Sequence, residues 1–151
     1  GAAGEDMKVL IDTCVSIDFL KKREPFADDA LRIFRAAASE LFAGYITAKS
    51  ATDIYYISHR CTHSDEESRK NLRALLTIVG MLDSAAIDVL QSLSSDISDF
   101  EDAVMVETAK RASVDCIVTR NQKDYAKSPV PVFGPGEFLE YLMSSGEEPL
   151  E

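Results

Sequence analysis

The sequence lacks any apolar run that approaches the roughly 20 residues needed to span a membrane as a helix. Its beginning also lacks a charged leader followed by an apolar stretch and a cleavage site. These absences predict a cytoplasmic protein without membrane contact. The hydrophobic fraction of 46% and the charged fraction of 28% are close to globular averages, which argues against a fibre or a disordered protein.

Cysteine and histidine are both scarce. Cys14, Cys61 and Cys116 lie far apart, form no CxxC pair and cannot all pair with one another. We interpret them as buried, reduced thiols. The two histidines, His59 and His63, lie on one short segment, so no histidine at a strand end is available as a base for Cys14. Thiol catalysis is therefore disfavoured.

Basic residues are outnumbered by acidic ones. Sixteen lysines and arginines stand against 26 aspartates and glutamates, which gives a formal net charge of -10 at pH 7. This charge repels a phosphate backbone rather than attracting it. A role with nucleic acid must therefore be local, with divalent cations or a few placed basic side chains reversing the field at the site.

The chain length of 151 residues fits one compact domain. Residues 1–6 are small and polar and precede Met7, so we interpret them as a disordered lead-in or a cloning remnant. A single domain is expected over residues 7–143, followed by an acidic tail over 144–151. No internal repeat or domain linker is recognisable.

Hydrophobic spacing predicts short strands that alternate with helices. The expected strands are 7–11, 44–46, 115–118 and 130–133, and the expected helices are 15–22, 25–41, 47–60, 64–81, 98–112 and 137–143. Capping boxes at 64–67 and 98–101 indicate two of the helix starts. This order predicts βαβ crossovers and hence an α/β fold, a three-layer α/β/α sandwich with a mainly parallel central sheet.

Polar segments follow two of the predicted strands. Asp12 comes directly after the first strand, and residues 119–124 follow the strand at 115–118. Because sites in such sheets lie at the carboxyl ends of the strands, residues more than a hundred positions apart can meet there. A carboxylate beside a buried strand is costly unless something positive meets it, and a metal ion would do so. Capping of the following helix by Asp12 is the alternative.

Further acids lie on predicted helices. Asp53 is about six residues inside its helix, beyond the turn where the helix dipole would favour it, and a surface pair with Lys49 is the alternative to a functional role. Asp99 and Asp102 lie three residues apart and share one face at the start of a later helix. For these two, stabilisation by the helix dipole is the alternative.

Together these segments resemble the PIN-domain family, which includes the VapC-like toxins. The resemblance rests on Val9-Leu-Ile-Asp12-Thr13, Ser50-Ala-Thr-Asp53-Ile54, Asp99-Phe-Glu-Asp102-Ala103 and Ile117-Val-Thr-Arg-Asn-Gln-Lys-Asp124-Tyr125. The order and spacing of the four blocks match the family, and the resemblance covers residues 7–142. The last two blocks are the most specific.

The resemblance implies clustered acids that hold Mg²⁺ or Mn²⁺ and hydrolyse RNA phosphodiester bonds. The residues that it implies are Asp12, Asp102 and Asp124 as metal ligands, Asp53 as a further catalytic acid, and Asp99, Thr119 and Asn121 as supporting groups. Position 53 departs from the family, which usually has the longer Glu there. The ions would activate a water molecule and stabilise charge on the phosphate.

Four basic side chains flank these acids in the sequence and could hold the RNA backbone, namely Lys49, Arg60, Arg120 and Lys123. Solvated surface charge is the alternative for each of them. The expected partners are an RNA substrate, an antitoxin protein if the chain is the toxin of a toxin–antitoxin pair, and a second copy of the chain in a homodimer.

Two other functions stay open at this point. A phosphatase could use Asp12 as a covalent nucleophile, but the expected second acid two residues on is missing because position 14 is Cys. A catalytically degenerate nuclease fold could instead serve as a protein-binding module. The aspartate at position 53 and the net negative charge favour this last possibility.

Overall fold

The structure, a computed structural model, describes residues 7–145. The expected lead-in at 1–6 and all but the first two residues of the expected tail at 144–151 lie outside the described residues. Five parallel strands form one sheet in the order β3-β2-β1-β4-β5. The strands are β1 (Lys8–Ile11), β2 (Ala43–Thr47), β3 (Gly80–Leu82), β4 (Cys116–Val118) and β5 (Val132–Phe133).

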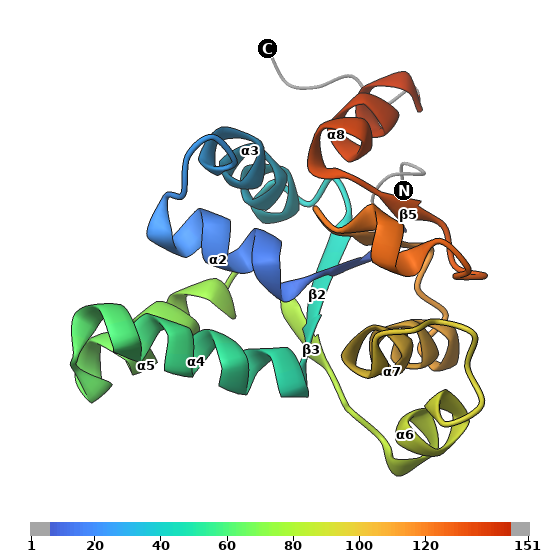
Figure 1. Ribbon diagram of the computed structural model, residues 1–151. Helices are drawn as coiled ribbons and strands as arrows, with labels where there is room; N and C mark the ends of the chain where they lie inside the picture. Colours follow the sequence, from blue (N-terminus) through green and yellow to red (C-terminus); the bar gives the residue numbers. More distant parts are fainter. Residues whose placement is uncertain (1–6, 146–151) are drawn as a thin grey trace.

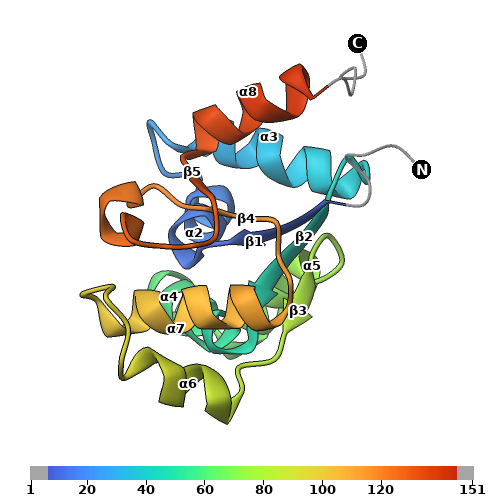
Figure 2. The same ribbon diagram turned by 90° about the vertical axis from the view of Figure 1, so that its right-hand side faces the viewer.

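Helices cover both faces of this sheet (Figures 1 and 2). They are α2 (Thr13–Lys21), α3 (Ala27–Ala38), α4 (Ala48–Thr62), α5 (Asp65–Leu75), α6 (Ala86–Ser92), α7 (Phe100–Arg111) and α8 (Pro135–Ser144), with a short 3-10 helix, η1 (Gln122–Tyr125). The predicted three-layer α/β/α architecture with a parallel sheet is confirmed. Within residues 7–145, no helix combines the length and the apolar character needed to cross a bilayer.

The alternation of side chains along β1 divides the core into two clusters. Val9 and Ile11 point to one face and pack with residues from α2, α3, α4 and α8. Leu10 points to the other face, where Ile117 and apolar residues of α7 surround it. Figure 2 shows α3 and α8 on one side of the strands and α7 on the other. Val9, Leu10 and Ile11 are all fully buried, so this central strand fixes the edge at which the following Asp12 emerges.

The predicted helix over 64–81 is too long, and the strand β3 was missed. Ser64 caps the helix as expected, because its hydroxyl accepts a hydrogen bond from the Glu67 amide at 3.1 Å. The helix ends at Leu75, and the chain turns into the sheet at Gly80. A Cβ atom at Gly80 would lie 2.9 Å from the ring of Tyr45, so glycine allows the close approach of β3 to β2.

Helix α6 was also not anticipated from the sequence. An ion pair between the buried Asp88 and the partly exposed Arg111 holds it against α7. Asp88 accepts hydrogen bonds from Arg111 Nε at 2.8 Å and Nη2 at 3.0 Å, and from the Thr108 hydroxyl at 3.0 Å. The Ala85 amide donates to the same carboxylate at 2.9 Å. Because Asp88 is fully buried, these four bonds keep its charge compensated.

The cysteines are all free, as expected, but they are not all buried. Cys116 lies in the core, Cys14 is half-buried, and Cys61 is exposed in the last turn of α4. The expectation of burial was wrong for Cys61, because the end of α4 extends beyond the sheet that it covers. Burial, followed by the charge of Asp12, raises the pKa of the Cys14 thiol. Both effects disfavour the thiolate that a cysteine nucleophile needs.

Candidate functional site

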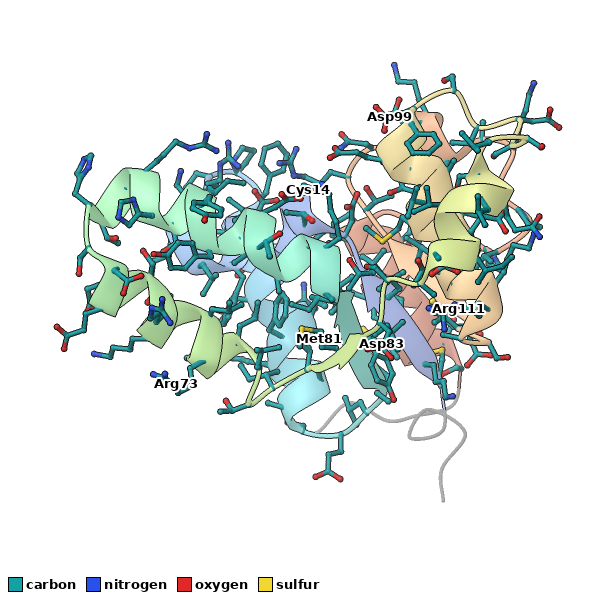
Figure 3. The ribbon with its side chains drawn as sticks, turned by 90° about the horizontal axis from the view of Figure 1, so that it is seen from below. Cys14, Arg73, Met81, Asp83, Asp99 and Arg111 are labelled. Carbon is teal, nitrogen blue, oxygen red and sulfur yellow. The ribbon has the colours of Figure 1, made fainter. Side chains whose placement is uncertain are left out.

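A cleft of about 770 Å³ opens at the carboxyl ends of β1 and β2, between α4 and α7. Figure 3 shows Cys14 between these two helices and Asp99 at the start of α7. Five acids named from the sequence line the cleft, namely Asp12 after β1, Asp53 on α4, Asp99 and Asp102 at the start of α7, and Asp124 on η1. The fold thus brings together residues that are up to 112 positions apart in the sequence.

Asp12 is the most buried of these carboxylates, with 9% of its surface exposed. One oxygen accepts a hydrogen bond from the Thr13 amide at 2.7 Å, so Asp12 does cap α2. The other oxygen accepts one from the Thr119 hydroxyl, also at 2.7 Å. Burial raises the pKa of Asp12, against the opposing effect of these hydrogen bonds. The capping role therefore does not compensate the charge of this carboxylate.

The Tyr125 hydroxyl joins Asp12 to Asp102. It lies 3.4 Å from Oδ2 of Asp12 and 3.2 Å from Oδ1 of Asp102, and the residue is only 2% exposed. Burial, together with both carboxylates, raises the pKa of Tyr125 far above its ordinary value, so it stays a donor. The sequence motif that matches the family includes Tyr125 but predicts no role for it. The only signal was its position directly after Asp124 in a polar segment.

The pKa of Asp102 is raised by its surroundings in the cleft. Burial, followed by the charges of Asp99, Asp12 and Asp124, raises its pKa from 3.8 to about 6. Within residues 7–145, no lysine or arginine forms an ion pair with Asp12 or Asp102. Four like charges thus lie near one another in the cleft, and the two most buried of them have no cationic partner.

The raised pKa of Asp102 makes the stability of the metal-free protein depend on pH. The folded state binds the Asp102 proton more tightly than the unfolded state does. The contribution of Asp102 to the free energy of unfolding is therefore fully present below pH 3.8 and is lost as the pH rises through about 6. We expect the melting temperature in EDTA to drop between pH 5 and pH 7. The drop should be smaller in Asp102→Asn. Equal pH profiles of the two proteins, measured by thermal unfolding, would contradict the assignment.

Tyr125→Phe tests the hydroxyl that joins the two acids. Removing it takes away the one proton that the buried Asp12 and the half-buried Asp102 share, and we expect a loss of about 1 kcal/mol in the free energy of unfolding at neutral pH without metal. Urea unfolding in EDTA measures this change. Tyr141→Phe is the matched control, because Tyr141 is exposed on α8. Equal stability of Tyr125→Phe and the wild-type protein would mean that the hydroxyl supports neither carboxylate.

Asp53 forms an ion pair with Lys49, which the sequence analysis gave as the alternative to a functional role for Asp53. Lys49 Nζ lies 2.7 Å from Oδ2 of Asp53 and also contacts the Glu101 carboxylate on the facing helix α7. All three side chains line the cleft. The capping box expected at 98–101 was wrong, because α7 begins after Asp99 and Glu101 reaches across to Lys49 instead of back to Ser98.

Of the supporting groups, Thr119 lies behind Asp12, and Asn121 and Asp99 line the cleft. Thr119 is fully buried. Its hydroxyl donates a hydrogen bond to Asp12 and accepts one from the backbone N–H of Asn121 at 3.0 Å. The side chain of Asn121 lines the cleft. Thr47 caps α4, and the hydroxyl of Ser50 links it to Thr13 at the start of α2. This chain of hydroxyls, which the sequence did not reveal, fixes α4 relative to α2.

The structure separates the four basic residues that were expected to hold RNA. Lys49 and Arg60 line the cleft, whereas Lys123 is exposed on η1 outside its lining. Arg120 is engaged elsewhere. Its guanidinium donates to Asp18 at 2.6 and 3.3 Å and lies 3.9 Å above the Phe26 ring. The structure therefore does not place Arg120 among the groups that could meet a phosphate in the cleft.

The residues present suit a hard divalent cation. Within residues 7–145, no three His, Cys, Asp or Glu side chains are close enough together to hold a metal ion by themselves. Mg²⁺, however, usually keeps several waters and binds proteins through only one or two carboxylates. Asp12 and Asp102 share the Tyr125 hydroxyl, lack a cationic partner and offer only oxygen donors. This pair fits the coordination chemistry of Mg²⁺ or Mn²⁺.

Fold and site together define an α/β/α domain with an acidic cleft at the carboxyl edge of its parallel sheet. A family model described as PIN domain matches residues 8–123. The chain belongs to the PIN-domain family, and the resemblance drawn from the sequence is confirmed. Comparison with curated protein sequences gave no match.

Several solved structures share this fold. DNA-bound VapBC from Salmonella typhimurium has a TM-score of 0.65 at 17% identity, and the match covers 85% of this chain and 98% of that chain. A toxin-antitoxin complex from Klebsiella pneumoniae has a TM-score of 0.62 at 20% identity, covering 84% and 97%. The sarcin-ricin loop cleaving toxin VapC20 from Mycobacterium tuberculosis has a TM-score of 0.57 at 12% identity, covering 72% and 86%.

Proposed function

We propose that this chain is a Mg²⁺- or Mn²⁺-dependent endoribonuclease. One observation carries the proposal: Asp12 and Asp102, from the end of β1 and the start of α7, share a buried hydroxyl without a compensating cation. Such an arrangement is unfavourable in the free protein and becomes favourable when a divalent cation is bound. Membership of the PIN-domain family and the likeness to VapC20, described as a sarcin-ricin loop cleaving toxin, support the proposal.

The acidic and supporting residues of the cleft have distinct roles in this proposal. Asp12 and Asp102 hold the cation directly, Asp124 contributes through a water molecule of its hydration shell, and Asp99 adds negative charge nearby. Thr119 and the Thr13 amide keep the Asp12 carboxylate in one orientation. Bound there, the cation lowers the pKa of a water molecule and neutralises charge on the phosphate. Asn121 lines the cleft beside Asp124 and can donate a hydrogen bond to the phosphate.

The basic side chains divide into two groups in this proposal. Arg60 lies on the cleft wall formed by α4 and is placed to hold a phosphate of the strand. Lys49 can bind an RNA phosphate when its ion pairs with Asp53 and Glu101 are broken. Lys123 can contact the RNA just outside the cleft. Such contacts position the backbone without reading its sequence.

Asp53→Ala tests the role of the acid that departs from the family. We expect cleavage to fall on the order of tenfold, which is less than the loss expected for Asp12 or Asp102. The loss is smaller because Asp53 contacts Lys49 and not the hydroxyl that Asp12 and Asp102 share. The free energy of unfolding should change by less than about 0.5 kcal/mol, since the pair is largely exposed. Asp53→Glu keeps the pair and should stay close to wild type. If wild type, Asp53→Ala and Asp53→Glu cleave RNA and bind metal equally, Asp53 has no part in the site.

We also propose a protein partner of the antitoxin type and a cytoplasmic location. Structures of VapBC and of a toxin-antitoxin complex support the protein partner.

A homodimer is proposed as well. Ile87, Leu90 and Leu93, in and just after α6, form an exposed apolar stripe for such a contact. Light scattering on the purified chain, beside Leu90→Asp, tests the homodimer.

A degenerate, protein-binding PIN fold is the second candidate, and the Lys49–Asp53 pair favours it. Calorimetric titration with Mn²⁺ separates the two candidates. The ribonuclease should bind Mn²⁺, and Asp102→Asn should weaken that binding. A wild-type protein that binds no Mn²⁺ would favour the protein-binding module.

A further inference from the structure

We propose that Tyr56 and Phe100 form a stacking surface for an unpaired nucleobase of the RNA strand in the cleft. This inference rests on the proposed ribonuclease function and names the form of RNA that the site accepts. Both aromatic side chains line the cleft, yet they are 64% and 47% exposed. Tyr56 belongs to the α4 wall, and Phe100 is the first residue of α7 on the other wall.

Tyr56 lies within a stripe that faces the cleft. Lys49, Asp53, Tyr56 and Arg60 follow one another at spacings of four, three and four residues, which places them on one side of α4. All four line the cleft. Arg60 therefore comes one helical turn after the ring, about 6 Å further along the axis. A ring and a guanidinium one turn apart suit the base and the phosphate of a nucleotide.

The Tyr56 ring has an aromatic neighbour on the same helix. The ring of Tyr55 meets it edge to face, with centroids 4.9 Å apart and an interplanar angle of 89°. The Tyr55 hydroxyl is itself bound to the carboxylate of Asp65 on α5. Tyr56 therefore packs against one aromatic neighbour and keeps 64% of its surface exposed at the cleft. Such a ring loses little conformational freedom when a flat ligand stacks on it.

The chemistry around the two rings favours a nucleobase over an apolar peptide side chain. An apolar anchor needs a dry pocket, but Asp53 and Arg60 lie on either side of Tyr56 along the stripe. Every base has a π face, and stacking on an aromatic side chain contributes about 1 to 3 kcal/mol per base. A base inside a duplex has both faces covered by its neighbours. The site should thus accept single-stranded or looped RNA.

Steady-state cleavage of a single-stranded RNA dodecamer in Mn²⁺ tests the proposal. Tyr56→Ala should raise KM about tenfold, equal to 1.4 kcal/mol, and should leave kcat within about twofold. Tyr56→Phe keeps the ring and should stay close to wild type. Phe100→Ala should shift KM in the same direction. Tyr141→Ala is the matched control, because Tyr141 is 42% exposed on α8 and lies outside the cleft.

The same dodecamer annealed to its complement provides the second arm. Wild type should cleave the duplex poorly, and Tyr56→Ala should not change its KM for the duplex. If wild type is active and Tyr56→Ala has an unchanged KM for the single strand, the stacking surface is overturned. The ribonuclease function would then stand, and the two rings would be assigned to contact with a protein partner. Equal losses on both substrates would also overturn it. A wild type that cleaves neither substrate would overturn the ribonuclease function and the stacking surface together.

Discussion

Asp12→Asn is expected to lower Mn²⁺-dependent RNA cleavage on the order of a thousandfold while leaving the fold intact. The substitution removes the most buried carboxylate of the cleft, and a metal ion contributes several kcal/mol to charge stabilisation in the transition state. Because burial raises the pKa of Asp12, its ionised form is unfavourable in the metal-free protein. The melting temperature of Asp12→Asn in EDTA should therefore equal or exceed that of wild type.

Both quantities can be measured on the same preparations, by gel-based cleavage and by thermal unfolding in EDTA. Asp28→Asn is the matched control, because Asp28 is an exposed aspartate near the start of α3. It should retain full cleavage. If Asp12→Asn cleaves as fast as Asp28→Asn, the chemistry lies elsewhere. If it unfolds several degrees earlier than wild type, its carboxylate serves mainly as the cap of α2.

Arg120→Ala is expected to destabilise the protein by about 3 kcal/mol, because it leaves the carboxylate of Asp18 without its partner. Asp18 is only 1% exposed, and the Arg120 guanidinium holds it through two nitrogen atoms while resting on Phe26. For a domain of this size the melting temperature should fall by roughly 6 to 12 °C. Thermal unfolding measures the change.

Arg120→Lys serves as the companion variant. It keeps the positive charge but loses the two-nitrogen contact and the stacking on Phe26, so an intermediate loss of stability is expected. RNA affinity, corrected for the folded fraction, should change little in both variants. A fully stable Arg120→Ala with weakened RNA binding would instead restore the role that the sequence suggested for this arginine.

The sequence was sufficient to predict the sheet edge on which the site lies. β1 ends directly before Asp12, and β4 ends directly before Thr119, so parallel pairing of these strands brings the two segments together. The fold class followed from the same alternation of strands and helices. The strand β3 escaped prediction because it has three residues, of which Gly80 and Met81 are exposed, and it therefore carries no hydrophobic signal.

The contacts inside the cleft were harder to predict, because they depend on the relative positions of distant elements. Asp18 and Arg120 are 102 residues apart, and neither position carries a local sign of the other. Glu101 fits a capping box by spacing, yet it lies close enough to Lys49 of α4 to bind that residue instead. Tyr125 acquires its position between two carboxylates only when η1 packs beside α7.

Cleavage of an end-labelled single-stranded RNA by the purified wild-type chain tests the central claim most directly. The proposed carboxylate cleft predicts internal cleavage in Mn²⁺ or Mg²⁺, none in excess EDTA, and none in Asp102→Asn. Asp102 is the proposed cation ligand at the start of α7, where its carboxylate accepts a hydrogen bond from Tyr125 at 3.2 Å. Cleavage that persists in EDTA, or that is equal in wild type and Asp102→Asn, would contradict a metal-dependent ribonuclease at this site.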